Sequence, residues 1–218
     1  MISHNRQPLY LFHRESPHSL GLTGPNPPSG CSPLPFTMNT DTYAAKYIPI
    51  GCRTPSPEEI IARRTAQDLK IPTATAVQIA APAMAGLIDG PCWLVPVPAS
   101  NGGLIANLAL ARAIAELVPG ARVKCAIGRA HPVESSAKRR MRGLPSLTVE
   151  QRAIFRVGGP IRLLSLYFVD NVMTTGTTIA ACRRALGWGV GLAYADASRY
   201  SHQPGFGIRV NCCPFPAR

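Results

Sequence analysis

The chain has 218 residues, of which 46% are hydrophobic, and a formal net charge of +12 from 23 basic and 11 acidic residues. This length allows one sizeable core, and it favours one domain with an extension over two domains. The excess of basic residues favours an anionic partner, such as a phosphorylated metabolite, a nucleic acid or an anionic membrane surface, and does not choose among them.

Cysteine usage and hydropathy exclude several protein classes. The seven cysteines form no CxxC pair, which argues against a zinc ribbon and against a disulfide framework. The first residues lack the unbroken apolar stretch of a secretory signal, and the mildly apolar run at residues 71–88 is interrupted by Pro72 and Pro82. We therefore expect a soluble, cytoplasmic protein with no membrane partner.

The two ends of the chain show no regular pattern. Residues 1–40 are rich in Pro, Ser, Gly and His, so we predict a disordered arm, and Met38 is an alternative start of the protein. Residues 201–218 are interpreted as a C-terminal tail. The predicted domain lies between them, at residues 41–200.

The first predicted helix covers residues 56–70. Ser56 can cap it, Pro57 suits its first position and Glu59 can complete a capping box. Residues 92–97 are short, apolar and rich in β-formers, which predicts a buried strand. Apolar residues at helical spacing between Leu104 and Val118 then predict a second helix.

Strands and helices continue to alternate towards the C-terminus. Residues 123–127 predict a strand, and the polar, basic stretch at residues 128–152 predicts a long loop with short helical turns. Residues 163–169 predict a strand, 170–177 a polar turn, 178–186 a helix and 190–195 a further strand. This alternation predicts an α/β fold with a Rossmann-like parallel sheet flanked by helices, which binds ligands at the carboxyl ends of its strands.

The segment LYFVDNVMTTGTTIAACRRAL, at residues 166–186, combines an apolar strand, an acid at its carboxyl end, a Thr-rich turn and a helix. A glycine in the turn lets an anion approach the backbone, the first amides of the helix are unpaired, and hydroxyl groups add donors. The turn is therefore predicted to bind a phosphate through five residues: Thr174, Thr175, Gly176, Thr177 and Thr178.

This segment resembles the PRPP-binding signature of type I phosphoribosyltransferases, in which four apolar residues, two acids and two apolar residues precede a Thr-Thr-Gly-x-Thr turn. The resemblance covers roughly residues 90–200 and implies the type I phosphoribosyltransferase fold. It places the 5′-phosphate of PRPP on the Thr-rich turn and assigns Asp170 and Asn171 as the catalytic pair at the ribose hydroxyls. Asn171 stands where the family has a second acid, so binding should survive this change better than catalysis.

A second segment resembles the short pyrophosphate loop of the same family. It is PVPASNGG, from Pro96 to Gly103, and it is closest to the ComF-like branch, whose zinc ribbon is absent here. The resemblance places Pro98, Ala99 and Ser100 at the pyrophosphate. A Pro-rich strand end that caps a helix explains the same spacing equally well.

The stretch HPVESSAKRRMRG, at residues 131–143, stands where the family has a flexible loop that closes over pyrophosphate. Basic side chains there could clamp the phosphates while the loop excludes water. The candidates are Lys138, Arg139, Arg140 and Arg142. An ordinary solvated basic loop is an equally good interpretation.

The resemblance implies transfer of a phosphoribosyl group from PRPP to an unidentified nitrogenous acceptor, with release of pyrophosphate. Mg²⁺ would bridge ribose and pyrophosphate oxygens without a direct protein ligand, and residues 41–90 or the tail would cover the acceptor. Relatives are often homodimers. Two alternatives stay open: a catalytically weak PRPP or nucleotide sensor, favoured by Asn171, and a ComF-like nucleic-acid-associated protein, favoured by the net charge and the KRRMR run.

Overall fold

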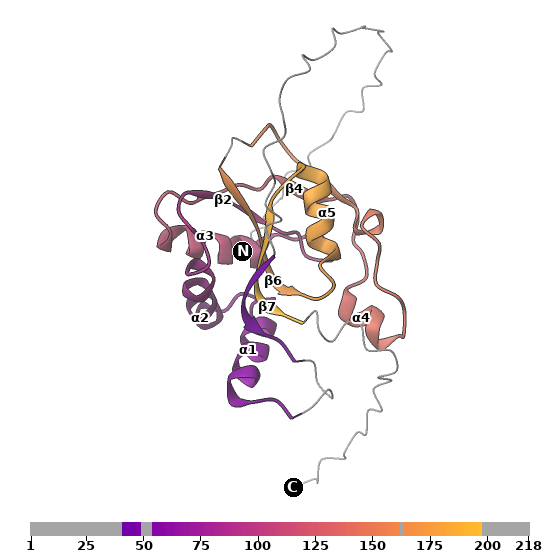
Figure 1. Cartoon of the computed structure of the whole chain (residues 1–218). Helices are drawn as coiled ribbons and strands as arrows, with labels where there is room; N and C mark the ends of the chain where they lie inside the picture. Colours follow the sequence, from indigo (N-terminus) through magenta and orange to yellow (C-terminus); the bar gives the residue numbers. More distant parts are fainter. Residues whose placement is uncertain (1–40, 49–53, 162–163, 198–218) are drawn as a thin grey trace, which may run out of the picture. The chain divides into compact units, whose positions relative to one another are not determined.

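A five-stranded sheet organises the residues that the computed structural model describes, which are 41–48, 54–161 and 164–197. Its strands lie in the order β1-β7-β6-β2-β3, and every neighbouring pair is parallel (Figure 1). Their bounds are β1 (Thr42–Lys46), β2 (Cys92–Pro96), β3 (Arg122–Val123), β6 (Ser165–Met173) and β7 (Val190–Asp196). The predicted α/β fold with a parallel sheet flanked by helices is confirmed.

The described residues all belong to one unit of the chain, Met38–Arg218. The predicted arm at residues 1–40 and the predicted tail at residues 201–218 lie outside the described residues. None of the described helices is both long enough and apolar enough to span a membrane.

Helices cover both faces of the sheet (Figure 1). One face packs against α1 (Pro57–Asp68), α2 (Ala74–Ala85) and α3 (Ile105–Leu117). The other packs against α5 (Thr177–Leu186) and an antiparallel strand pair, β4 (Ile127–Arg129) and β5 (Ile154–Arg156). Between β4 and β5 the chain forms the short helix α4 (Ser136–Met141) and the 3₁₀ helix η1 (Glu150–Arg152).

The apolar runs of the strands follow from this two-sided burial. In β2, Leu94 packs in the cluster with α1, α2 and α3, whereas Val95 packs on the α5 side. Val169 and Phe168 of β6 divide between the two clusters in the same way. Successive side chains of a strand point to opposite faces, so a strand covered on both faces needs apolar residues at successive positions.

The N-terminus of α1 confirms the predicted capping box. The Ser56 hydroxyl accepts a hydrogen bond from the Glu59 amide at 3.3 Å, and the Glu59 carboxylate accepts one from the Ser56 amide at 2.9 Å. After α1 the sequence analysis missed α2. This helix lies in the apolar run at residues 71–88 and continues through Pro82, whose carbonyl accepts a hydrogen bond from the Gly86 amide at 3.1 Å.

Two predicted strand bounds are wrong. Residues 123–127 do not form one strand, because the chain turns out of the sheet after Val123: the Ala126 amide bonds back to the Lys124 carbonyl at 2.9 Å, and Ile127 begins β4. The predicted turn at residues 170–177 begins later. β6 continues to Met173 because β7 extends far enough to pair with it at Asp196.

The order of the strands places a crevice beside β2 and β6. From β2 the chain crosses through α3 to β3 on one side, and from β6 it crosses through α5 to β7 on the other side. At such a reversal of strand order the two loops at the carboxyl ends diverge and leave room for a ligand.

Candidate functional site

A cavity of about 470 Å³ lies at the carboxyl ends of β2 and β6. Its walls come from the end of β6 with the turn into α5, the loop after β2, the end of α1, and the segment between β4 and β5. The cavity brings together most of the predicted site residues: Pro98, Ala99, Ser100, Asp170, Asn171, Thr174, Thr175, Gly176, Thr177 and Thr178.

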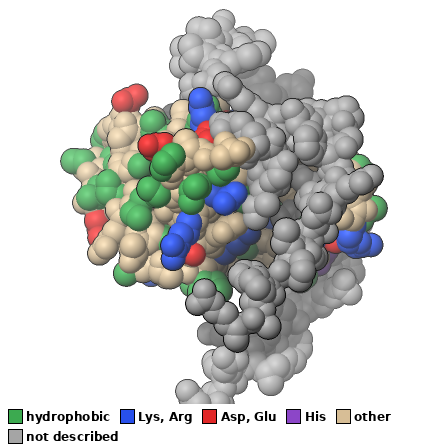
Figure 2. Space-filling view, turned by 90° about the horizontal axis from the view of Figure 1, so that it is seen from below, with side chains coloured by type: hydrophobic (Ala, Val, Ile, Leu, Met, Phe, Trp, Pro, Cys, Tyr) green, Lys and Arg blue, Asp and Glu red, His purple; other side chains and the backbone are tan. Residues whose placement is uncertain are grey.

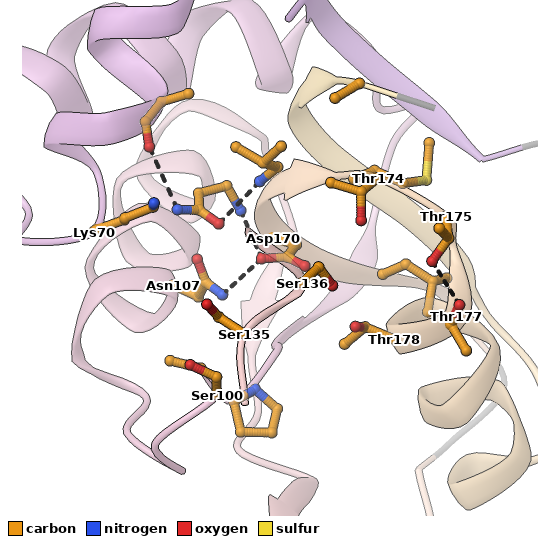
Figure 3. Close-up of a pocket in the computed structure, with 18 of the residues that line it drawn as sticks. Lys70, Ser100, Asn107, Ser135, Ser136, Asp170, Thr174, Thr175, Thr177 and Thr178 are labelled. Atoms are coloured by element: carbon orange, nitrogen blue, oxygen red, sulfur yellow. Dashed lines mark hydrogen bonds between the residues drawn. The ribbon is translucent and has the colours of Figure 1, made fainter. Parts of the chain in front are cut away.

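The Thr-rich turn meets the cavity at the N-terminus of α5. Gly176 immediately precedes the helix with φ +70°, a conformation that side chains with a Cβ rarely adopt, and no side chain caps the first turn. The hydroxyls of Thr175 and Thr177 are hydrogen-bonded to each other at 2.6 Å (Figure 3). Unpaired amides and hydroxyl donors at a helix N-terminus can bind an anion, as the sequence predicted for this turn.

Asp170 lies within β6, between the turn and the loop after β2. Its Oδ1 accepts hydrogen bonds from the Asn171 amide at 2.8 Å and from Asn107 Nδ2 at 3.2 Å (Figure 3). Burial raises the pKa of Asp170 to about 6, although these hydrogen bonds and the nearby Arg129 and Arg152 lower it. Among the described residues none donates a hydrogen bond to Oδ2, so this oxygen is available to a ligand.

Asn107 was missed by the sequence analysis. It is a buried polar residue on α3, and its amide nitrogen also donates to the Val97 carbonyl at 2.8 Å. Asn107 therefore links the end of β2 to the carboxylate of Asp170. A polar residue inside an apolar helical pattern was the only available indication in the sequence.

Asn171 is already engaged within the fold. Its Nδ2 donates to the Ala66 carbonyl of α1 at 3.4 Å, and its Oδ1 accepts a hydrogen bond from the Val172 amide at 2.9 Å. Asn171 lines the cavity, but its amide group connects β6 to α1. Both ends of the side chain thus have a structural partner before any ligand binds.

The loop after β2 presents free amides to the cavity wall. The Ala99 amide donates to the Gly103 carbonyl and the Gly102 amide to the Ala99 carbonyl, both at 2.8 Å, which closes a tight turn. Within the described part of the chain the amides of Ser100 and Asn101 donate to no acceptor. These two N–H groups are suited to bind an anion.

Arg129 in β4 holds this loop in place. Its Nε donates to the Ala99 carbonyl at 2.9 Å, its Nη2 to the Pro98 carbonyl at 3.1 Å, and its Nη1 to the Arg152 carbonyl. Burial lowers the pKa of Arg129. Each of the three nitrogens thus donates to a backbone carbonyl, and the guanidinium fixes the position of the loop.

Arg152 in η1 also lines the cavity, and the sequence analysis predicted neither Arg129 nor Arg152 as a site residue. It is only 4% exposed, its Nη2 donates to the Ser136 hydroxyl at 3.2 Å, and its buried Nε has no hydrogen-bond partner. Burial and the neighbouring Arg129 lower the pKa of Arg152. A buried cation beside a second cation is a costly arrangement, and an anion in the cavity would offset the repulsion between them.

The basic side chains predicted to contact pyrophosphate lie elsewhere. Arg139 and Arg142 pair with Glu134 at 3.5 and 3.0 Å, and Lys138 is exposed. None of these three residues lines the cavity, and the Arg140 side chain lies outside the described residues. From the predicted flexible loop, Ser135 and Ser136 line the cavity instead.

The donor set of the cavity limits how a metal ion could bind. Among the described residues no group of three or more His, Cys, Asp or Glu side chains could hold one. Of the described side chains that line the cavity, Asp170 is the one carboxylate. This set fits Mg²⁺, which often takes one protein carboxylate and completes its shell with phosphate oxygens and water.

Comparison of the chain with protein-family models finds no matching family, and comparison with curated proteins finds no relative. The geometry of the cavity is therefore the basis on which a function can be assigned.

Proposed function

We propose that this protein is a type I phosphoribosyltransferase, which uses PRPP and Mg²⁺ to transfer a phosphoribosyl group to a nitrogen acceptor and releases pyrophosphate. One observation carries the proposal. A single cavity combines two sets of anion donors with a carboxylate, Asp170, between them. PRPP has the same order of groups, since a phosphate and a pyrophosphate flank its ribose.

Each part of PRPP has a corresponding group in the cavity. The turn from Thr174 to Thr178 at the start of α5 would bind the 5′-phosphate. Asp170 would accept hydrogen bonds from the ribose hydroxyls through its free Oδ2. The amides of Ser100 and Asn101, together with the Arg152 guanidinium, would bind the pyrophosphate.

The chemistry follows from these positions. The acceptor nitrogen forms a bond to the anomeric carbon, the carbon–oxygen bond to pyrophosphate breaks, its electron pair leaves with pyrophosphate, and the acceptor nitrogen loses its proton. The Asp170 carboxylate stabilises positive charge at the anomeric carbon, and Arg152 stabilises negative charge on the leaving group. Bound Mg²⁺ would neutralise further charge on the pyrophosphate oxygens.

A PRPP or nucleotide sensor is the second candidate function. Its support is the engagement of Asn171, whose amide group contacts the Ala66 carbonyl and adds no negative charge near the ribose. With Asp170 as the sole acid among the described residues of the lining, the cationic transition state receives less stabilisation than a pair of acids would give. Binding without turnover would support this function.

Nucleic-acid binding is the third function to be tested. On the face shown in Figure 2, Lys and Arg side chains are interspersed with hydrophobic ones on the part of the surface that the structure describes. The support for this function is therefore the net charge of +12, which favours binding of polyanions in general. Salt-sensitive retardation of DNA or RNA by a protein that binds no PRPP would favour this function.

The test is calorimetric titration of PRPP with Mg²⁺ into the wild type and into the variants Asp170→Ala and Thr175→Ala. Asp89→Ala and Thr75→Ala, at exposed positions away from the cavity, are matched controls. We expect saturable binding that the first two variants lose and the controls keep, followed by pyrophosphate release with some nitrogenous base. No binding by the wild type would refute the proposal, and binding without release would favour the sensor.

A further inference from the structure

The proposed function does not specify the chemical class of the acceptor. The residues of one cavity wall indicate which class would bind there. This wall, here named the α1 wall, consists of Tyr47, Ala66, Gln67 and Lys70. It comes from α1, from the turn that follows this helix and from the residue after β1. All of these lie within residues 41–90, where the sequence analysis expected a cover for the acceptor. In the view of Figure 3, Asp170 lies between Lys70 on one side and the Thr-rich turn on the other.

The fold fixes the α1 wall in position. Leu69 is 1% exposed and anchors the end of α1 in the core, and the Lys70 amide closes the last turn by donating to the Gln67 carbonyl at 3.1 Å. The Ala66 carbonyl accepts the hydrogen bond from Asn171. The Tyr47 amide donates to the Asp196 carbonyl at 2.7 Å. The wall is therefore connected to β6, whose end lines the cavity, and to the neighbouring strand β7.

The charges of the cavity lining single out Lys70. Arg129 donates from all three nitrogens to backbone carbonyls, and Arg152 donates to the Ser136 hydroxyl. Asp170 interacts electrostatically with these two arginines. Lys70 is an exposed residue of the cavity lining, and its ammonium forms no hydrogen bond or ion pair with the described residues, so it is free to bind an anion.

We infer that the acceptor is a nitrogen heterocycle that carries a carboxylate, and that Lys70 binds this carboxylate. The inference rests on the proposed function. Both phosphate ends of PRPP already have donors, at the Thr-rich turn and at the loop after β2. The acceptor must approach the anomeric carbon from the remaining wall, where Lys70 is the charged residue and Gln67 offers an amide for the polar edge of a ring.

The test compares bases with and without the carboxylate, with Mg²⁺ and PRPP present. The pairs are nicotinate with nicotinamide and orotate with uracil, and the readouts are calorimetric binding to the protein–PRPP complex and pyrophosphate release. We expect the acid of at least one pair to bind more tightly than its neutral partner. Lys70→Met should weaken binding of that acid about 10- to 100-fold, as expected for a lost charge-assisted contact, and Lys70→Arg should restore most of it.

The controls separate this inference from the proposed function. Lys70→Met should leave PRPP affinity unchanged, and Lys46→Met, at an exposed position that does not line the cavity, should change neither ligand. Loss of PRPP binding in Lys70→Met would overturn the inference, because Lys70 would then bind PRPP itself. Preference for the neutral bases, or no binding of any acid by a protein that binds PRPP, would also overturn it while leaving the PRPP site in place.

Discussion

Arg152→Met is expected to stabilise the free protein and to weaken its ligand binding. The Arg152 Nε is buried without a partner, and an unsatisfied buried donor costs about 1–3 kcal/mol. Methionine has a similar reach and removes both this donor and the repulsion from Arg129. Loss of the favourable interaction with Asp170 and of the hydrogen bond to Ser136 offsets part of the gain, so we expect a net stabilisation of about 1 kcal/mol or less, or at most roughly 2–4 °C in Tm.

The same variant should lose affinity for pyrophosphate. A hydrogen bond to a charged group contributes about 1.5–3 kcal/mol, which corresponds to roughly 10- to 150-fold in Kd. Thermal unfolding without ligand and calorimetry with pyrophosphate or PRPP in the presence of Mg²⁺ measure the two effects. Arg156→Met is the matched control, because Arg156 is exposed and its Nη2 donates only to the Gly159 carbonyl at 3.3 Å.

Arg152→Met must raise the stability of the free protein and lower its affinity for pyrophosphate. If Arg152→Met destabilises the protein and leaves pyrophosphate affinity at the wild-type value, Arg152 is a structural residue and the assignment of the pyrophosphate end is wrong. If both variants lose affinity equally, net charge and not the buried guanidinium determines binding.

Three further predictions concern the end of β6 and the turn that follows. Folding raises the pKa of Asp170 from its ordinary 3.8 to about 6, so the folded state is penalised progressively as the pH rises between these values. Asp170→Asn should therefore stabilise the free protein at pH 7 and not below pH 4, as measured by urea unfolding at both pH values. Gly176→Ala should lower the free energy of unfolding by about 1–2 kcal/mol, because φ is +70°. No atom lies within 4 Å of the new Cβ, so the loss comes from backbone strain and not from a clash. A urea midpoint equal to that of the wild type would contradict this. Asn171→Asp should destabilise the protein by about 1–3 kcal/mol, since the Ala66 carbonyl loses its donor, and an increase in the denaturation midpoint would show that the contact is unimportant.

The Thr-rich turn was predictable because its determinants are local. An apolar strand, a glycine in the turn and the first residues of a helix lie within one short segment, and each acts through the backbone of its own neighbours. The helix α1 was predictable for the same reason, since its capping box spans only Ser56 to Glu59. The end of β6 was predicted too early, because its last pairs depend on the length of β7.

The arginines of the cavity were not predictable from local pattern. Arg129 and Arg152 meet because β4 pairs with β5, and the chain between these strands passes through α4 and η1. The sequence showed a denser group of basic residues at 138–142, yet Arg139 and Arg142 are engaged by Glu134, which the pattern of positive charges did not take into account. Burial, and not the density of charge along the chain, distinguishes the arginine that faces the cavity.

The charges of the cavity also explain why Asp170 has a pKa near 6 and not far higher. The carboxylate is half-buried, and Arg129 and Arg152 with two hydrogen-bond donors partly compensate its desolvation. A polyanionic ligand that binds Arg152 adds negative charge near Asp170 and neutralises one of the two cations that lower its pKa. Both changes favour the protonated carboxyl. A divalent cation that enters with the ligand acts in the opposite direction. Under the proposed function, the need for an ionised Asp170 at the ribose is thus a physical reason to expect that PRPP binds together with Mg²⁺ and not alone.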